Sequence, residues 1–173
     1  MSLFYPTIYR RRITDVTTTD LNNLGVRVVF LDVDNTLTTH DNPDLADDVN
    51  NWLQVMQSAG IALIIVSNNS DERVAPFAQT IGLPYTAHAR KPLPTGYRSA
   101  AKALNIPLSQ CVTIGDQIFT DILGANLSGV SSVLLEPIEP EVEQKFIVFK
   151  RKIERLLLAN RRQRRRKESE YGY

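Results

Sequence analysis

The sequence predicts an α/β fold in which a mostly parallel sheet is covered by helices on both faces. Short apolar runs, rich in Val and Ile, alternate along the chain with segments whose apolar residues recur at helical spacing. Strands that alternate with helices form parallel sheets joined by right-handed crossovers. The length of 173 residues suits a single domain with a complete hydrophobic core.

Five segments are predicted to be strands. Each is short and apolar, and each ends at a polar residue or at Gly or Pro, as strands do. Such apolar runs are typical of strands that are buried on both faces of a parallel sheet. The four clear strands are 26–31, 61–66, 111–114 and 132–135, and 83–86 is a weaker fifth.

Helices are predicted in the segments between and after the strands. The first shows apolar residues at helical spacing from Leu45 to Met56, with Asp44 as its N-cap and Gly60 as its stop. The remaining helices are predicted at 71–81, 95–104, 121–126 and about 141–160.

The formal net charge of +1 conceals an uneven distribution of charge along the chain. Residues 145–173 hold 11 Lys and Arg against 3 acids, which leaves 9 basic and 16 acidic residues in 1–144. We expect an N-terminal segment, 1–24, that packs on the core or lies at a membrane interface. A core over 25–160 and a basic tail over 161–173 without fixed structure follow it.

The chain carries few signals of an extracellular or membrane-spanning protein. Its single cysteine, Cys111, excludes an intramolecular disulfide and opens an apolar run, so we expect it in the core. No apolar run approaches the roughly 20 residues needed to cross a bilayer, and the first residues lack the order of a secretory signal. We therefore expect a cytoplasmic protein, with peripheral attachment at the inner membrane face as an alternative.

Polar groups suited to phosphate chemistry follow the predicted strands. The carboxyl ends of parallel strands meet at one edge of a sheet, where open α/β folds bind ligands. These groups are Asp32 and Asp34 after the first strand, Ser67 and Asn68 after the second, Lys91 before a helix, and Asp116 and Asp121 after Cys111–Ile114. Asp32 and Asp34 project to one side of an extended chain, and their repulsion requires a cation or a proton. Taken alone, this pair is equally compatible with a strand followed by an acidic turn.

Taken together, these groups resemble the four motifs of the haloacid dehalogenase (HAD) superfamily of phosphohydrolases. The matching segments are DVDNTL, VSNN, ARKP and GDQIFTD, and they span most of the chain. They also resemble those of the capless YqeG-type phosphatases (subclass III), which are similar to the mitochondrial phosphatidylglycerophosphatase family. The resemblance implies a Rossmann-like three-layer sandwich without a cap domain, and a phosphatase that uses Mg²⁺.

The resemblance also implies a role for each motif residue, and the chemistry of each side chain agrees with it. Asp32 is the nucleophile that forms an aspartyl-phosphate, and Asp34 is the general acid and base. The side chains of Asp32 and Asp116 and the backbone carbonyl of Asp34 hold Mg²⁺. The groups that bind the phosphoryl oxygens are the Ser67 hydroxyl, the Asn68 backbone N–H and Lys91.

Five other residues keep alternative interpretations. Thr36 either hydrogen-bonds the turn after the strand or seats the acid–base carboxylate. Asp121 holds a metal-bound water, holds the lysine, or caps the helix that it begins. Arg90 is either a solvated charge or a substrate ligand, and His40 and His88 lie on predicted loops with or without contact to substrate.

The gaps between the predicted elements have no room for a cap domain. Members of the resembled superfamily that act on small substrates typically close the site with a cap, so we expect a large substrate here. Arg10, Arg11 and Arg12 follow aromatic residues, and the basic tail adds positive charge. Both features favour an anionic phospholipid at a membrane surface, such as phosphatidylglycerophosphate. The alternatives are another large or soluble phosphate ester, an RNA- or ribosome-docking protein with weak activity, and a receiver-type signalling domain. The oligomeric state is not indicated.

Overall fold

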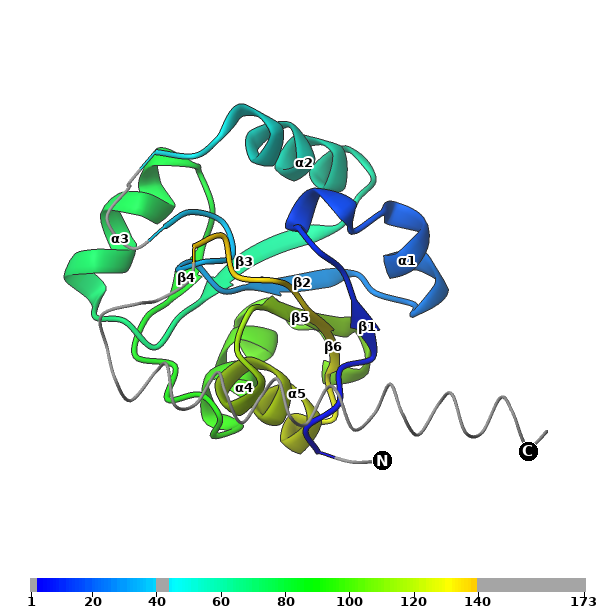
Figure 1. Cartoon of the computed structure of the whole chain (residues 1–173). Coiled ribbons are helices and arrows are strands. Elements are labelled where there is room, and N and C mark those ends of the chain that lie inside the picture. The colour runs from blue at the N-terminus through cyan, green and yellow to red at the C-terminus, as the bar shows by residue number, and fades with distance from the viewer. Residues whose placement is uncertain (1–2, 40–43, 140–173) are drawn as a thin grey trace. The chain divides into compact units, whose positions relative to one another are not determined.

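A six-stranded parallel sheet forms the centre of the computed structural model, which describes residues 3–39 and 44–139. The sheet has the order β1-β6-β5-β2-β3-β4, and every neighbouring pair is parallel. Helices cover both of its faces (Figure 1), which confirms the predicted Rossmann-like three-layer fold. No separate cap domain occurs in the part of the chain that the structure describes. The strands are β1 Ile8–Tyr9, β2 Val28–Leu31, β3 Ala62–Val66, β4 Tyr85–Thr86, β5 Cys111–Gly115 and β6 Ser131–Leu134.

The helices divide between the two faces of the sheet. The first three pack with one hydrophobic cluster, and α4 and α5 pack with the other. The helices are α1 Thr18–Asn23, α2 Asp47–Ser58, α3 Asp71–Thr80, α4 Thr95–Ala103 and α5 Leu123–Ser128. Short 3₁₀ turns occur at η1 Ile13–Asp15 and η2 Leu108–Gln110, and a π-helical turn, η3 Ile118–Ile122, precedes α5.

Two local predictions differ from the structure. Helix α2 has Ala46 as its N-cap, so the assignment of Asp44 as N-cap is wrong; Asp47 and Asp48 in the first turn complement the positive helix end instead. The helix predicted from Asp121 begins earlier, because η3 extends it back to Ile118. Strand β1 and helix α1 were not predicted. The helix predicted at 141–160 and the basic tail lie outside the described residues.

The three central strands end level with one another. Leu31 at the end of β2 pairs with Ile114 of β5 on one side and with Ile65 of β3 on the other. All three strands are buried, so their carboxyl ends present the following residues at a single, sheltered edge.

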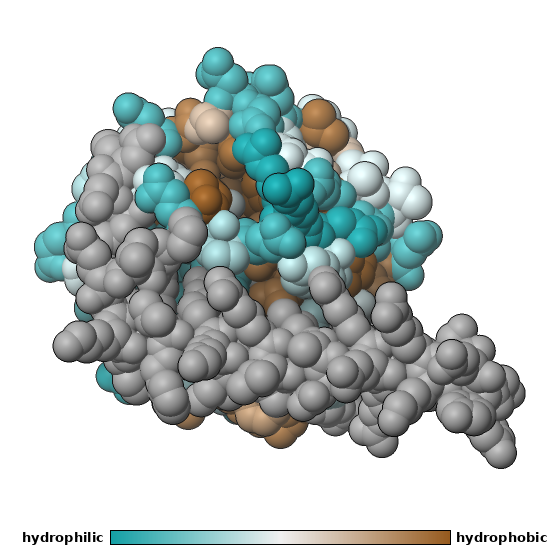
Figure 2. Space-filling view, in the orientation of Figure 1, coloured by the Kyte–Doolittle hydropathy of each residue, from teal (hydrophilic) through white to brown (hydrophobic). Residues whose placement is uncertain are grey.

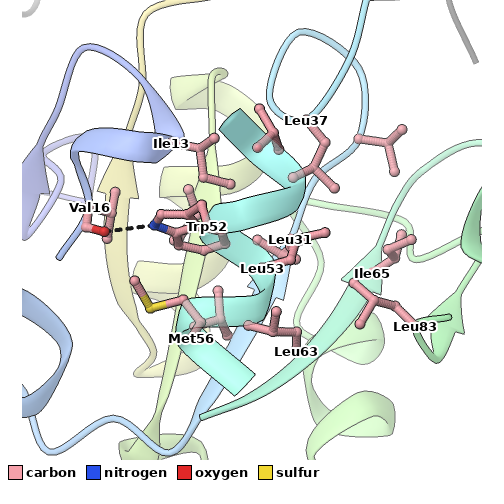
Figure 3. Packing of buried hydrophobic residues seen from close by; sticks show 14 of the residues in the cluster. Ile13, Val16, Leu31, Leu37, Trp52, Leu53, Met56, Leu63, Ile65 and Leu83 are labelled. Carbon is pink, nitrogen blue, oxygen red and sulfur yellow. Dashed lines mark hydrogen bonds between the residues drawn. The ribbon is translucent and has the colours of Figure 1, made fainter. Parts of the chain in front are cut away.

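The larger hydrophobic cluster lies between the sheet and α2 (Figure 3). Helix α2 directs Trp52, Leu53 and Met56 into this cluster at helical spacing, and all three are buried. The indole Nε1 of Trp52 donates a hydrogen bond to the Val16 carbonyl oxygen at 2.7 Å. This bond satisfies a buried donor and fixes the segment after η1 against the helix.

Close backbone approach shapes the opposite face. The rings of Phe30 and Tyr97 pack with centroids 5.8 Å apart, and Cys111 is buried in this cluster as expected for a core residue. A Cβ atom on Gly96 would lie 2.5 Å from the Ala89 carbonyl oxygen. Glycine therefore allows the start of α4 to lie directly against the loop that carries Lys91.

The N-terminal segment completes the sheet and packs along η3 and α5. Ile8 of β1 pairs with Val133 of β6, and the Phe4 ring packs edge-on against Phe119. The Asn126 side chain donates to the carbonyl oxygens of Leu3 and Tyr5, at 2.7 and 3.0 Å. Within the described ranges, no helix is long and apolar enough to cross a membrane.

Replacing Trp52 with Phe is expected to lower the free energy of unfolding by about 1–3 kcal/mol, because the buried Val16 carbonyl loses its donor. Chemical denaturation followed by far-UV circular dichroism measures the change. Val55 lies on the same helix but is exposed, so Val55→Ala is the matched control and is expected to stay within about 0.5 kcal/mol of wild type. Equal effects of the two substitutions would contradict the role given to the indole hydrogen bond.

Candidate active site

The predicted motif residues meet where the chain order reverses in the sheet. From β2 the chain continues to β3 and β4 on one side, and later returns to β5 and β6 on the other. Asp32 follows β2, Ser67 follows β3 and Asp116 follows β5, so the three residues lie at neighbouring strand ends. Such switch points create the crevice in which open α/β sheets bind ligands.

A buried lysine joins two of the carboxylates. Lys91 Nζ donates to Asp32 Oδ1 and to Asp121 Oδ1, both at 2.6 Å. The side chains of Lys91 and Asp121 are 3% and 0% exposed, whereas that of Asp32 is 10% exposed. Asp32 is therefore the carboxylate of this pair that an incoming molecule reaches.

Burial and the charges of the cluster shift the pKa values of both Asp32 and Lys91. Burial raises the pKa of Asp32 to about 6; Lys91 opposes that rise, and the nearby charge of Asp121 adds to it. Burial alone would lower the pKa of Lys91, but the charges of Asp121 and Asp32 outweigh burial and raise it. Lys91 is accordingly a fixed positive charge at neutral pH.

The backbone around Lys91 is held by Asn68. The Asn68 side chain accepts from the Lys91 backbone N–H at 2.6 Å and donates to the Lys91 carbonyl oxygen at 2.9 Å. Sequence reasoning assigned the Asn68 backbone to phosphate binding and missed this use of its side chain. Ser67 is buried beside it, and its Oγ accepts from the Asn69 backbone N–H at 3.2 Å.

Asp121 anchors the lysine and the helix start at once. Its Oδ2 accepts from the Gln117 backbone N–H at 3.2 Å, while its Oδ1 accepts from Lys91. A Cβ atom on Gly115 would lie 2.4 Å from the Asp121 Cγ, so only glycine at the end of β5 leaves room for this carboxylate. Of the alternatives for Asp121, the geometry shows the lysine contact; Asp121 does not cap a helix that it begins, because the helical turn starts at Ile118 with Gln117 as its N-cap.

Asp34 is held by groups that sequence reasoning did not identify. Its Oδ2 accepts from Asn69 Nδ2 at 2.5 Å, and its Oδ1 accepts from Arg73 Nη2 at 2.6 Å. Asn69 follows β3, and Arg73 lies in the first turn of α3. The sequence signal was an arginine within one helical turn of the VSNN segment.

Among the described residues, Thr36, His88 and Arg90 form no hydrogen bond or ion pair with the carboxylate cluster. Thr36 is buried, and its Oγ1 has no hydrogen-bond partner among the described residues; it lines a cavity of about 510 Å³ beside the start of α2. None of the residues that line this cavity is Asp32, Ser67 or Lys91. His88 and Arg90 are exposed on the loop before Lys91, and His40 lies outside the described residues.

The acidic cluster fits a divalent cation. One carboxylate oxygen from each of Asp32, Asp116 and Asp121 lies within 4.8 Å of the others, and all three residues are buried. Three carboxylates against one lysine leave a net charge of about −2, and oxygen donors are the ligands that Mg²⁺ prefers. Asp32 and Asp116 could hold such an ion. Asp121 is less suited, because Lys91 and the Gln117 backbone N–H donate to its two oxygens, whereas Lys91 contacts one oxygen of Asp32.

Comparison with known proteins places the chain in a family. A model of haloacid dehalogenase-like hydrolases matches residues 7–129. The chain belongs to the haloacid dehalogenase-like hydrolase family. This family contains hydrolases, so the comparison gives no support to a receiver-type signalling domain. The predicted superfamily is confirmed.

Similar proteins agree on phosphatase chemistry. The chain is 34% identical over 157 residues to Probable phosphatase YqeG of Bacillus subtilis, covering 90% of both proteins. It is 33% identical over 98 residues to a phosphoglycolate phosphatase of Colwellia psychrerythraea, covering 51% of this chain and 43% of that protein. The chain is thus a phosphatase of the haloacid dehalogenase type.

Solved structures support the fold. An uncharacterised protein from Listeria monocytogenes matches with a TM-score of 0.56 at 20% identity, covering 69% of this chain and 85% of that one. The cobalt-bound deoxy-D-mannose-octulosonate 8-phosphate phosphatase from Haemophilus influenzae matches with a TM-score of 0.52 at 13% identity, covering 65% and 69%. At these identities the matches show a shared fold alone.

In EDTA, the Asp32→Asn protein is expected to be more stable than wild type at pH 7.5 by about 2–3 kcal/mol, and the difference is expected to shrink toward pH 4.5. The folded pKa of Asp32 is about 6, whereas an unfolded aspartate titrates near about 4. The folded wild type therefore retains a proton that the unfolded chain has lost, and it loses stability as the pH rises through this window.

Urea denaturation followed by the fluorescence of Trp52, the single tryptophan, measures this difference. Asp47→Asn, at an exposed position in the first turn of α2, is the control; it loses a favourable interaction with the positive helix end and is expected to lower stability at pH 7.5 by about 0.3–1 kcal/mol, opposite in sign to Asp32→Asn. A less stable Asp32→Asn protein at pH 7.5 would show that burial does not penalise this carboxylate.

Proposed function

We propose that the protein is a Mg²⁺-dependent phosphomonoesterase that works through an aspartyl-phosphate on Asp32, and that its substrate is phosphatidylglycerophosphate. The observation that carries the mechanism is the contact of Lys91 with Asp32 at the sheltered edge of the sheet, beside Asp116. A nucleophilic carboxylate has to meet an anionic phosphate there, and the fixed positive charge of Lys91 reduces their repulsion.

Asp32 is better suited to attack than the other acids of the cluster. Asp121 is fully buried, and its two oxygens accept from Lys91 and from the Gln117 backbone. Asp32 is more exposed and follows the central strand β2. In the first step a carboxylate oxygen of Asp32 bonds to phosphorus while the bond from phosphorus to the leaving oxygen breaks. The leaving oxygen takes a proton from Asp34 and departs as an alcohol.

Hydrolysis of the aspartyl-phosphate completes the cycle. Asp34, now a carboxylate, accepts a proton from water as the water oxygen attacks phosphorus. The bond between phosphorus and the Asp32 oxygen breaks, which releases inorganic phosphate and restores both aspartates to their starting forms. Lys91 and the Ser67 hydroxyl stabilise the charge on the phosphoryl oxygens during both steps. Mg²⁺, held by Asp32 and Asp116, would supply further charge neutralisation at the phosphate.

Openness of the site supports a large substrate. The described residues between β2 and β3 form a loop and α2, and those between β3 and β4 form α3, so neither connection adds a domain over the strand ends. A site without a cap accommodates a phosphate that projects from a membrane surface. The substrate class is inferred from this openness and from the resemblance of the sequence motifs to those of the capless YqeG-type phosphatases.

The apolar residues near the N-terminus offer few anchors for a membrane surface. Phe4 and Ile8 contribute to the fold, through Phe119 and β6, so they are not available as anchors. Leu3 and Leu127 are exposed, and the Asn126 contact with the Leu3 carbonyl brings them near each other. Figure 2 shows that exposed hydrophobic residues on the viewed face are scattered among hydrophilic ones. We therefore propose that attraction between the basic residues of 161–173 and anionic lipid contributes most of the binding to a membrane surface.

Asp32→Asn is expected to reduce hydrolysis of phosphatidylglycerophosphate in mixed micelles by more than about a thousandfold, because an amide is a poor nucleophile. EDTA is expected to have a comparable effect that added Mg²⁺ reverses. Phosphate release measures both, with Asp47→Asn as the active control. Full activity of Asp32→Asn would rule out an aspartyl-phosphate at this residue. Activity on p-nitrophenyl phosphate without activity on the lipid would retain the mechanism and reject the substrate.

Removal of residues 161–173, which contain six basic residues, is expected to weaken binding to phosphatidylglycerol vesicles while hydrolysis of p-nitrophenyl phosphate continues. Vesicle co-sedimentation measures binding, and neutral phosphatidylcholine vesicles are the control. Unchanged vesicle binding together with lost binding to RNA would instead favour the RNA-docking alternative.

A further inference from the structure

The proposed acid–base residue has an exposed arginine as its neighbour. Arg73 Nη2 donates to Asp34 Oδ1 at 2.6 Å, and Asn69 Nδ2 donates to Asp34 Oδ2 at 2.5 Å. The side chains of Arg73 and Asp34 are 39% and 19% exposed. The groups that hold Asp34 thus include Arg73, which is partly exposed to solvent.

Arg73 lies on the side of the site from which the leaving group departs. Asp34 has to contact the leaving oxygen in order to protonate it, and Arg73 contacts the same carboxylate. The distance from the leaving oxygen to the Arg73 guanidinium is at most about 8 Å. It comprises a hydrogen bond to Asp34, the width of the carboxylate and a second hydrogen bond to Arg73. A group that is only a few covalent bonds beyond the leaving oxygen therefore comes within reach of the guanidinium.

The charges of the site determine what kind of group would bind there. Asp32, Asp34, Asp116 and Asp121 make the strand ends acidic, and Lys91 is buried against two of them. A second anionic group on the substrate would be repelled by this cluster unless a cation received it. A guanidinium has five N–H donors and binds phosphate or carboxylate through two of them.

We propose that Arg73 is a specificity-determining residue that binds a second anionic group on the leaving group, a few bonds from the scissile phosphate. The substrate class is a phosphomonoester whose alcohol carries a phosphodiester or a carboxylate. This inference rests on the proposed phosphatase function with Asp34 as the acid. Asn69 continues to hold Asp34 when Arg73 turns toward the substrate, which accounts for the two separate contacts on one carboxylate.

Three soluble phosphate esters test the inference with Mg²⁺ present. Glycerol 1-phosphate has an uncharged leaving group, glycerophosphoglycerophosphate has a phosphodiester on its leaving group, and phosphoglycolate has a carboxylate. Wild type is expected to prefer one of the charged esters over glycerol 1-phosphate in kcat/KM. Arg73→Gln is expected to reduce that preference by on the order of tenfold, mainly through a higher KM for the charged ester. The charged ester whose kcat/KM falls further in Arg73→Gln identifies the anionic group that Arg73 binds.

Two matched variants separate charge and geometry from general damage. Arg73→Lys keeps the charge without the paired donors, so it is expected to retain part of the preference. Arg27 is exposed at the opposite edge of the sheet, before β2, and Arg27→Gln is expected to leave the preference at the wild-type value. Circular dichroism and thermal unfolding confirm that each variant is folded.

If wild type and Arg73→Gln have the same ratio of kcat/KM for the charged ester to kcat/KM for glycerol 1-phosphate, the inference is overturned. Hydrolysis of p-nitrophenyl phosphate by both proteins would then leave the proposed function intact. Failure of wild type to hydrolyse any of these esters, including p-nitrophenyl phosphate, overturns the proposed function and this inference with it.

Discussion

The contact of Lys91 with Asp32 and Asp121 is the interaction around which the site is organised. A buried lysine is costly unless carboxylates surround it, and buried carboxylates are equally costly without a cation. Neighbouring elements are arranged so that all three remain in place: Asn68 fixes the lysine backbone, and Gly115 leaves the space that Asp121 occupies. Even so, burial, with the nearby charge of Asp121, raises the pKa of Asp32, and a divalent cation bound beside it would favour the ionised carboxylate.

The parallel sheet makes this concentration of charge possible. The central strands β2, β3 and β5 each contribute one or two polar residues immediately after their buried segments, so groups that are far apart in the sequence share an edge. The apolar clusters on the two faces keep water away from the strands without covering their carboxyl ends. Stability and chemistry are therefore separated: the faces of the sheet carry the packing, and one edge carries the reactive groups.

Much of this arrangement was predictable from the sequence because it follows from short-range patterns. Apolar runs predicted the central strands, and Asp32, Ser67 and Asp116 were predicted as site residues because they directly follow those strands. Contacts that depend on how loops meet in space were not predictable, including those of Asp34 with Asn69 and Arg73. Strand β1 has two residues, too few for any periodic signal, and the π-helical turn that carries Asp121 to its contact with Lys91 was not indicated by the spacing of its apolar residues.

The edge strand β1 has a consequence for the order in which the molecule is built. Among the described residues, Ile8 and Tyr9 of β1 pair only with Val133 and Leu134 of β6, so β1 has no place in this sheet until β6 has been synthesised. A ribosome adds about 5–20 residues per second, which leaves the N-terminal segment waiting for several seconds or more. The central strands have their partners earlier, so β1 joins the sheet only after the strands from β2 to β6 have been synthesised.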